Sequence, residues 1–219
     1  MDNTDKEQLL PDTTPNNTIR RLPRYYHYMQ DLISQGDKYV TSDQVANYFG
    51  IHPTQVRKDL AITGLIGKPK VGHVLAEAVK SIHDFLGWNK KREAFLVGAG
   101  NLGSAIIGYE GFDVTGVRIA AAFDTDPEKI GKVINGVEVH PMRKFTDMAL
   151  KAKVQIGIIT CSPGATEAVA NTMVVSGITA IWNFTSVKPY LPEGIIMEQT
   201  ELFSCLSVIS RRIKESENK

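Results

Sequence analysis

Residues 95–105 read Phe-Leu-Val-Gly-Ala-Gly-Asn-Leu-Gly-Ser-Ala, and this stretch decides the fold of the chain. An apolar run ends in the pattern Gly-x-Gly-x-x-Gly and passes directly into a helix-compatible segment. In such a loop Gly98 permits the tight turn, and Gly100 leaves room for a pyrophosphate to approach the backbone. Gly103 lets the helix pack closely on the strand. The stretch therefore predicts a dinucleotide-binding loop.

A second apolar run, residues 117–123, ends in Asp124, 21 residues after Gly103. A carboxylate at this place in a dinucleotide-binding fold accepts hydrogen bonds from the hydroxyls of an adenosine ribose. The free N–H groups at the start of the intervening helix would face the phosphates. The order of strand, turn, helix, strand and acid favours this interpretation over a glycine-rich turn with an unrelated acid nearby.

The alternation of apolar runs and helical segments continues after Asp124. A turn or short helix is expected at 126–130, strands at 137–139, 154–159 and 178–182, and a helix at 165–176. This pattern predicts an α/β fold, with a Rossmann doubly wound parallel sheet over residues 89–198. Ligands of such sheets bind beyond the carboxyl ends of the strands, where Asp124, Thr160 and Asn183 lie.

The composition is that of a globular protein, with 219 residues, 42% hydrophobic and 22% charged. No apolar run approaches the roughly 18 residues of a membrane span. Residues 1–17 are polar and lack the apolar core of a signal peptide. Two cysteines, Cys161 and Cys205, cannot form a disulfide framework, and the five histidines lack ligand-like spacing. These observations favour a cytoplasmic protein without a metal site.

The charge is distributed unevenly along the chain, although the net charge is only +1. Residues 18–92 hold twelve Lys/Arg against six Asp/Glu, which gives +6. Residues 93–199 hold eight against eleven, which gives −3. A basic module joined to a nucleotide-binding module indicates a nucleic-acid partner for the first.

The basic module has the pattern of a helix-turn-helix. After a disordered lead over 1–17, a helix is expected from Tyr25 to Ile33. A capping box of Thr41 and Gln44 opens a helix over 42–49, and a Gly50 turn leads to a second helix over 53–62. Core positions of this pair are predicted at three apolar residues, namely Ile51, Val56 and Leu60.

Residues 64–73 have the Gly/Lys composition of a wing hairpin that touches phosphates, and a further helix is expected from His73 to Trp88. We therefore predict a winged helix-turn-helix domain over 18–88. The alternative is a three-helix module with a solvated basic face, because helix-turn-helix shapes also serve protein contacts. A last helix is expected over 201–214. Its apolar stripe would have to pack against an apolar surface, either that of its own sheet or that of a partner subunit.

With both halves in view, the chain resembles the Rex family, the redox-sensing transcriptional repressors of bacteria, from Arg20 to Ile213. The resemblance rests on motifs in both halves, namely Arg21-Leu22-Pro23 with Tyr25-Tyr26, Val56-Arg57-Lys58-Asp59-Leu60, Gly98 to Gly103, Phe123-Asp124 with Asp126 and Lys129-Ile130-Gly131, and Asn183-Phe184. Some positions depart from common family residues: His27 replaces an arginine, Glu201 an aspartate, and Leu202 the phenylalanine of some members. The sequence Ala61-Ile62-Thr63-Gly64 replaces the frequent Ser-Tyr-Phe-Gly, and Gly72-His73 replaces a Gly-Tyr wing.

The resemblance implies a homodimer that binds double-stranded operator DNA and takes NAD⁺/NADH as its cofactor. NADH would favour a conformation that cannot hold the operator. The C-terminal helices, within residues 199–219, would be exchanged between subunits. Such a protein is a repressor and not an enzyme, so no catalytic residue is assigned.

Three sets of site residues follow from the motifs and the resemblance. Cofactor binding is expected of Gly98, Ala99, Gly100, Asn101, Leu102, Gly103, Tyr109, Asp124, Asp126, Lys129, Thr160 and Asn183. DNA binding is expected of Arg20, Arg21, Thr54, Gln55, Arg57, Lys58, Lys68 and Lys70. The switch between cofactor states is expected to use His27, Tyr109, Glu201 and Leu202.

Two other functions remain open from the sequence. An NAD-dependent dehydrogenase would need a proton donor or acceptor near the nicotinamide, and Cys161, Tyr109 and His140 are the candidates. No Tyr-x-x-x-Lys motif or His/Asp pair supports that function, and it leaves the basic front of the chain unexplained. A CoA- or nucleotide-binding interaction protein would bind its cofactor but would show no salt-dependent duplex binding.

Overall fold

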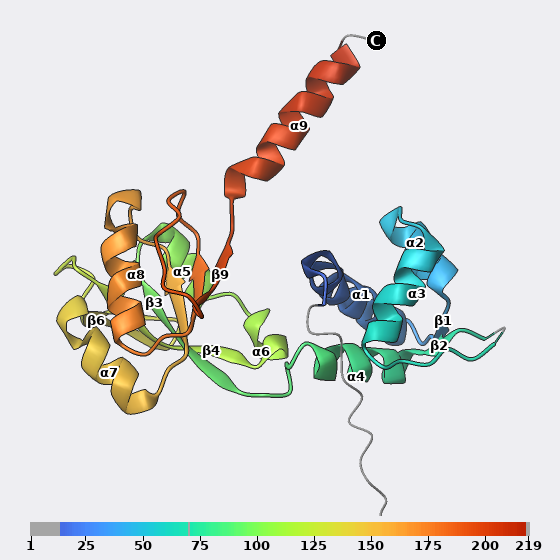
Figure 1. Cartoon of the computed structure of the whole chain (residues 1–219), viewed down its shortest axis with the longest axis horizontal. Helices are drawn as coiled ribbons and strands as arrows, with labels where there is room; N and C mark the ends of the chain where they lie inside the picture. Colours follow the sequence, from blue (N-terminus) through green and yellow to red (C-terminus); the bar gives the residue numbers. More distant parts are fainter. Residues whose placement is uncertain (1–13, 70, 218–219) are drawn as a thin grey trace, which may run out of the picture. The chain divides into compact units, whose positions relative to one another are not determined.

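The computed structural model describes residues 14–69 and 71–217, and among these the residues up to 89 and the residues from 90 onward form two compact units (Figure 1). Each unit is contiguous in sequence. No helix within the described ranges is long and apolar enough to cross a membrane.

Within residues 14–69 and 71–89 the first unit holds four helices and a two-stranded antiparallel sheet (Figure 1). The helices are α1 (Asn16–Ser34), α2 (Ser42–Phe49), α3 (Pro53–Ile62) and α4 (Leu75–Phe85), and the strands are β1 (Tyr39–Val40) and β2 (His73–Val74). Leu22, Met29, Val56, Leu60 and Ile82 form part of its core and are fully buried. The helix-turn-helix predicted for this region is confirmed.

Helix α1 begins much earlier than the sequence predicted. It starts at Asn16 and includes Pro23, whereas the disordered lead was expected to reach residue 17. Buried residues at 18, 22, 25, 26 and 29 form one helical stripe, and this burial stabilises the helix despite the proline. Residues 1–13 of the predicted lead lie outside the described residues.

The capping box predicted before α2 is confirmed. The Thr41 hydroxyl accepts a hydrogen bond from the Gln44 amide at 3.1 Å, and the Gln44 side chain accepts one from the Thr41 amide at 2.7 Å. Gly50 ends α2 in the left-handed region with φ 65°. Val56 and Leu60 are buried as expected, but Ile51 is only half-buried because it lies in the turn.

The predicted wing is a hairpin turn that continues into β2. The amides of Lys68 and Gly72 donate to each other's carbonyl oxygens at 2.7 and 3.0 Å. A Cβ on Gly72 would overlap the carbonyl oxygen of Val40, so this position requires glycine. Because His73 pairs with β1, helix α4 begins at Leu75 and ends at Phe85, within the predicted range of 73–88.

The second unit is built on a seven-stranded sheet with the order β5-β6-β4-β3-β7-β8-β9. The strands are β3 (Arg92–Val97), β4 (Val117–Asp124), β5 (Val133–Ile134), β6 (Val137–Pro141), β7 (Ile156–Ile159), β8 (Ala180–Asn183) and β9 (Ile196–Gln199). Every strand pair is parallel except β5 with β6. Without β5 this is the doubly wound Rossmann order, so the predicted fold class is confirmed. Sequence reasoning missed β5 and β9.

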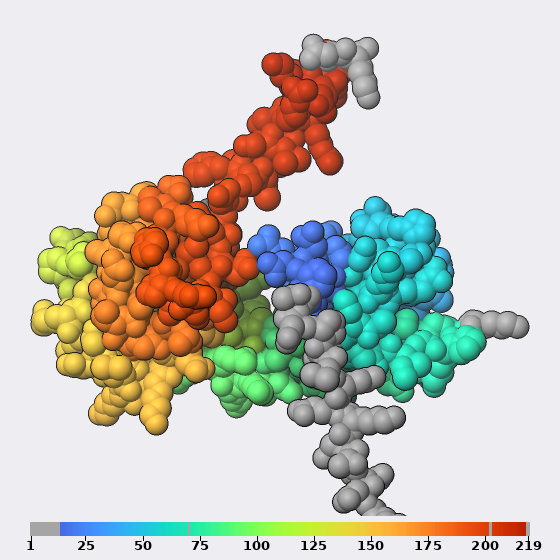
Figure 2. Space-filling view, in the orientation of Figure 1, coloured from blue at the N-terminus to red at the C-terminus, as the bar shows by residue number. Residues whose placement is uncertain are grey.

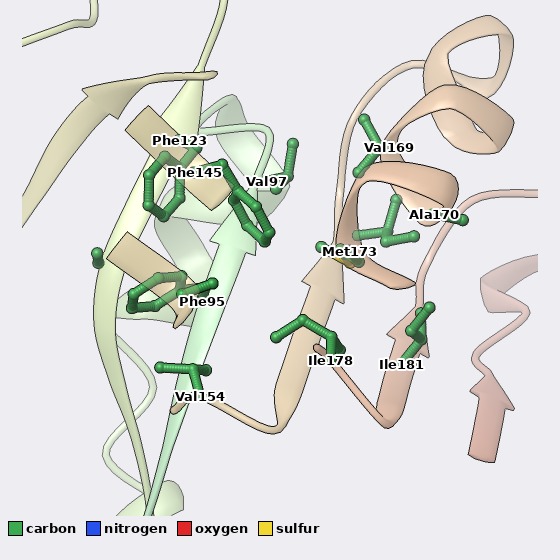
Figure 3. Close-up of a cluster of buried hydrophobic side chains, with 13 residues drawn as sticks. Phe95, Val97, Phe123, Phe145, Val154, Val169, Ala170, Met173, Ile178 and Ile181 are labelled. Carbon is green, nitrogen blue, oxygen red and sulfur yellow. The ribbon is translucent and has the colours of Figure 1, made fainter. Parts of the chain in front are cut away.

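Helices cover the two faces of this sheet (Figure 1). They are α5 (Asn101–Ile107), α6 (Phe112–Thr115), α7 (Phe145–Ala152) and α8 (Thr166–Val175). Side chains alternate along β3, so Phe95 and Val97 pack with residues of α7 and α8 (Figure 3). Leu96 lies in the opposite cluster, which includes residues of α5. The loop after β3 is therefore fixed between two packed layers.

The last helix, α9 (Leu202–Glu217), starts and ends close to the predicted 201–214. All of its described side chains are exposed, including the apolar Phe203, Leu206, Ile209 and Ile213 (red in Figure 2). The predicted apolar stripe is therefore present, and no part of the chain that the structure describes covers it. Exchange of this helix between subunits stays a prediction.

Candidate functional site

The glycine loop turns sharply at the carboxyl end of β3. Gly98 has φ +106°, and its amide donates to the carbonyl oxygen of Phe123 in β4 at 2.8 Å. A Cβ on Gly98 would lie 2.5 Å from the amide nitrogen of Cys161. Only glycine fits this conformation and this space. The turn is thus held between the ends of β4 and β7.

Gly103 and Gly100 have opposite surroundings. A Cβ on Gly103 would overlap the carbonyl oxygen of Gly98, because α5 and the turn are in close contact. A Cβ on Gly100 would meet nothing within 4 Å. The space beside Gly100, at the start of α5, is therefore open to a ligand that approaches the backbone. These residues fit the pyrophosphate of a dinucleotide.

Asp124 ends β4 and faces the loop. Its Oδ2 accepts from the Ala99 amide at 2.9 Å, and its Oδ1 accepts from the Asp126 amide at 2.9 Å. Burial alone would raise the pKa of Asp124, but these amides and the ammonium of Lys129 together hold it below its ordinary value. The carboxylate is therefore ionised at neutral pH and is oriented as a hydrogen-bond acceptor.

Lys129 lies in the turn that follows, where it compensates the local negative charge. Its Nζ is 3.1 Å from the Oδ2 of Asp124 and 3.5 Å from the Oδ2 of Asp126. The side chain is about one-third exposed at 35%. Asp124, Asp126 and Lys129 are thus brought together, and their contact with a cofactor stays a prediction.

Thr160 and Cys161 follow β7 at the same edge of the sheet. The Thr160 hydroxyl lies 2.8 Å from the carbonyl oxygen of Gly98 and 3.1 Å from that of Val97, so it holds the turn against β7. Burial raises the pKa of the Cys161 thiol. The protonated thiol is a poor nucleophile at neutral pH, which gives no support to a catalytic role.

Two of the predicted cofactor residues have their side chains engaged elsewhere. Asn183 is fully buried, its Nδ2 donates to the carbonyl oxygen of Val187 at 2.7 Å, and its Oδ1 accepts from the Thr185 amide at 3.0 Å. The side chain of Asn183 therefore orders the loop after β8, and a contact of this residue with the cofactor stays a prediction. Leu102 is partly buried and packs against the apolar cluster that includes residues of α5, so much of its side chain is engaged within the protein.

Tyr109 and Asn101 are exposed at the two ends of α5. Tyr109 is 64% exposed and its ring meets Phe112 edge to face, with 5.5 Å between the centroids. Phe112 in turn contacts Trp182 at 5.9 Å. Sequence reasoning missed both aromatic contacts. Phe112 lies only three residues after Tyr109, whereas Trp182 is 73 residues after Tyr109 and no local pattern indicates it.

The second candidate site is the outer face of α3. Thr54, Arg57 and Lys58 are exposed, as are Arg20 on α1 and Lys68 in the wing. Lys70 was also predicted to bind DNA and lies outside the described residues. The exposed cations of the predicted DNA-binding set thus lie on α1, on α3 and in the wing, as expected for a surface that binds phosphates.

Asp59 forms a buried polar cluster behind this face, which sequence reasoning missed. Its carboxylate is 0% exposed and accepts from Thr18 and Gln55 at Oδ1, from Tyr25 at Oδ2, and from Arg21 at both oxygens. Burial would raise the pKa of Asp59, but these hydrogen bonds hold it below its ordinary value. The sequence contained one indication of this cluster, because Asp59 lies between the predicted core positions Val56 and Leu60 on the same helix.

This cluster changes the expectation for Arg21. Its guanidinium lies 2.7 and 2.8 Å from the two oxygens of Asp59 and its side chain is 23% exposed. Its guanidinium joins α1 to α3 through Asp59, and a contact with DNA stays a prediction. Removing one partner of such a buried pair is strongly destabilising, because the other charge is left without compensation.

The predicted switch residues lie on separate elements. His27 is exposed on α1, with its ring edge-on to Tyr26. Glu201 is exposed directly before α9 and accepts a hydrogen bond from Ser204 at 2.9 Å. The side chain of Leu202 is outside the described residues. Their participation in a switch stays a prediction.

The third dehydrogenase candidate, His140, has its Nδ1 3.4 Å from the Oε1 of Glu138. Among residues 14–69 and 71–217, no group of three or more His, Cys, Asp or Glu side chains could hold a metal ion.

The two candidate sites differ in chemistry. The glycine loop and Asp124 offer a cradle for a dinucleotide, and the outer face of α3 offers a separate basic surface.

Family models match each half of the chain. One described as "Putative DNA-binding protein N-terminus" matches residues 13–61, and one described as "CoA binding domain" matches residues 89–187. The redox-sensing transcriptional repressor Rex of Treponema denticola is 41% identical over 187 residues, which cover 85% of this chain and 89% of that protein. Rex of Porphyromonas gingivalis is 35% identical over 209 residues, 95% of this chain and 96% of its own.

Solved structures agree with these relatives. The crystal structure of RSP in complex with β-NAD⁺ and operator DNA has a TM-score of 0.87 and 31% identity, over 94% of this chain and 95% of that one. The complex of RSP with β-NADH has a TM-score of 0.86 over 94% and 97%. RSP is described as a Rex-family repressor, and the relatives are named as repressors, not as enzymes. The chain therefore belongs to the Rex family of redox-sensing transcriptional repressors.

Proposed function

We propose that this chain represses transcription by binding operator DNA and that NADH releases it from the operator. The observation that carries the proposal is the combination of an open Gly100 cradle beside an ionised Asp124 with an exposed basic α3 in the other unit. The RSP complexes with β-NAD⁺, β-NADH and operator DNA support both parts. A protein that binds operator DNA in this way would act in the cytoplasm.

The cofactor would lie across the carboxyl ends of β3 and β4. The loop from Gly98 to Gly103 would hold the pyrophosphate at the start of α5, and Asp124 would accept hydrogen bonds from the adenosine ribose. Lys129 is close enough to Asp124 to share that carboxylate with the ribose hydroxyls. Tyr109 would lie near the nicotinamide.

The DNA would be read by α3 in the major groove, with Arg57 and Lys58 on its exposed side. Lys68 and Lys70 in the wing would add phosphate affinity that depends on salt. Two copies of the chain would bind two half-sites, and the half-site spacing fixes the separation of their recognition helices. The apolar side of α9 would be covered by exchange within this dimer.

NADH and NAD⁺ differ in charge and ring planarity at the nicotinamide, so only contacts that distinguish the two forms can drive release. His27, Tyr109, Glu201 and Leu202 are the residues we assign to this discrimination. A useful coupling between cofactor and operator needs about 1–3 kcal/mol. Closure of the Rossmann domains by NADH would supply it by changing the separation of the two winged helices.

Duplex binding with cofactor titration tests this function. A labelled fragment of the protein's own promoter region, at fixed salt, is expected to be released by NADH and retained with NAD⁺. CoA serves as the matched ligand control, because one family model is described as a CoA binding domain. The duplex can also be a site selected from the whole genome. If neither NADH nor NAD⁺ changes the affinity for that duplex, the sensor function is contradicted. Release by CoA alone would favour a CoA-binding function.

The role of Asp124 predicts a preference for NADH over NADPH. A 2′-phosphate would meet a carboxylate that two amides and Lys129 hold ionised. Juxtaposed like charges cost several kcal/mol, so we expect NADPH to bind about 100-fold or more weakly in a fluorescence titration. Asp124→Ser should reduce the ratio of the affinities for NADH and NADPH. Glu128 is an exposed acid in the same turn, and Glu128→Gln should leave this ratio unchanged. Equal wild-type affinities for the two cofactors would contradict the assignment.

A further inference from the structure

The side chain of Gln55 has an unusual position for a residue of the recognition helix. It is only half-exposed, and its Nε2 donates to the Oδ1 of Asp59 at 2.9 Å, one helical turn further along α3. Thr54, Arg57 and Lys58 on the same helix are exposed. Arg57 also has a partner within the helix, a long contact of 3.5 Å to the carbonyl oxygen of Pro53. The protein itself thus orients the side chain of Gln55 through a shorter bond to a buried carboxylate before DNA arrives.

The acceptor-only character of Asp59 decides which end of the Gln55 amide faces outward. An ionised carboxylate accepts hydrogen bonds and cannot donate them. The Gln55 amide must therefore direct its NH₂ group toward Asp59 and its Oε1 away from it. Asp59 is ionised, because the hydrogen bonds from Arg21 and its other partners hold its pKa below the ordinary value.

Asp59 itself is immobilised from a second helix. Thr18, Arg21 and Tyr25, spaced on one side of α1, donate to it at 2.7–3.0 Å. These α1 donors satisfy a carboxylate that is 0% exposed, so neither oxygen is free to turn toward another partner. The orientation of Gln55 is thus fixed through Asp59 by the packing of α1 on α3.

We propose that Asp59 is a positioning residue for operator recognition, and that it sets the base preference of this protein by holding the Gln55 amide with Oε1 outward. The inference rests on the proposed DNA-binding function and adds a specificity mechanism to it. An oriented Gln55 offers one acceptor and one remaining N–H to a base edge, a pattern complementary to the N6 and N7 of adenine. A free amide would offer either end.

The test measures base preference as well as affinity. Wild type, Gln55→Ala, Asp59→Asn and the double variant are titrated against the operator and against duplexes with each half-site base pair substituted singly. We expect Gln55→Ala to lose about 10-fold of discrimination at one base pair of each half-site. Asp59→Asn should lose discrimination at that same base pair, because asparagine can donate as well as accept and allows both orientations of Gln55.

Additivity separates positioning from simple structural support. If Asp59 acts through Gln55, the double variant should discriminate no worse than Gln55→Ala alone. Tyr25→Phe is the matched control, since it removes a donor to the other oxygen of Asp59 and leaves the Gln55 contact intact. It should lower the melting temperature and leave the base preference unchanged.

A second variant keeps the inference testable if Asp59→Asn does not fold. Gln55→Glu has the same shape and brings a second carboxylate to Asp59, so we expect the preference to be lost as fully as in Gln55→Ala. Retention of the preference by Gln55→Glu would overturn the proposal. The proposal would also be overturned if Asp59→Asn lost the same affinity for every duplex. The same holds if the losses of discrimination in the two single variants added up in the double variant. A wild-type protein without any operator binding would instead overturn the proposed function.

Discussion

Gly103→Ala is expected to abolish NADH binding by disrupting the second unit, whereas Gly100→Ala is expected to abolish it in a folded protein. The added Cβ on Gly103 would overlap the backbone of Gly98, and the turn and α5 cannot separate without disturbing β3. We expect a loss of roughly 3 kcal/mol or more in the free energy of unfolding. At Gly100 the Cβ meets open space, and φ −82° is allowed for alanine.

Thermal unfolding with and without NADH measures both variants. Ligand at about 100 times its Kd stabilises a native protein by about 2.7 kcal/mol, and this shift should be present in wild type and absent in Gly100→Ala. Without ligand, Gly100→Ala should unfold at the wild-type temperature or slightly above it, since alanine restricts the unfolded chain. A normal NADH shift in Gly100→Ala would contradict a pyrophosphate at this loop, and wild-type stability of Gly103→Ala would contradict the close contact with Gly98.

Arg57→Ala is expected to reduce operator affinity by roughly 30-fold to 10⁴-fold. A good bidentate contact from arginine to a base pair contributes about 1–3 kcal/mol, and a dimer would lose two of them. Arg57 is exposed near the start of α3, where recognition helices contact base edges. The affinity for NADH should be unchanged, because Arg57 and the glycine loop lie in different units.

Lys80→Ala provides the matched control for charge. Lys80 is an exposed cation of the same unit on α4, where its ammonium pairs with Asp84. Its removal should change operator affinity little at moderate salt, whereas Arg57→Ala should weaken the operator complex much more than the complex with an unrelated duplex. Equal losses in the two variants would reduce the role of Arg57 to general electrostatic attraction.

Much of the fold could be predicted from local patterns. The glycine loop, the acid after β4 and the alternation of apolar runs specify a parallel sheet, because each is complete within a short stretch of sequence. The capping box of Thr41 and Gln44 likewise requires only neighbouring residues. Such features depend on backbone geometry that a few residues determine.

The remaining features depend on contacts between distant residues. The pair of Arg21 and Asp59 spans 38 positions, and nothing near either residue indicates the other. Asn183 ends a strand, as a ligand-binding residue would, but its burial is decided by the loop that folds back over it. The early start of α1 arises from the burial of its first turns in the tertiary structure. Strand β9 forms because it pairs with β8. Local propensity predicts neither of these contacts.

The contiguity of the two units has a consequence for how such a protein can change over generations. The chain passes once from residue 89 to residue 90, and no later segment of the described chain returns to the first unit. One family model matches within each unit. A single recombination breakpoint near this position would therefore transfer a whole helix-turn-helix unit or a whole dinucleotide-binding unit to another gene. Operator choice and ligand choice can then be inherited separately.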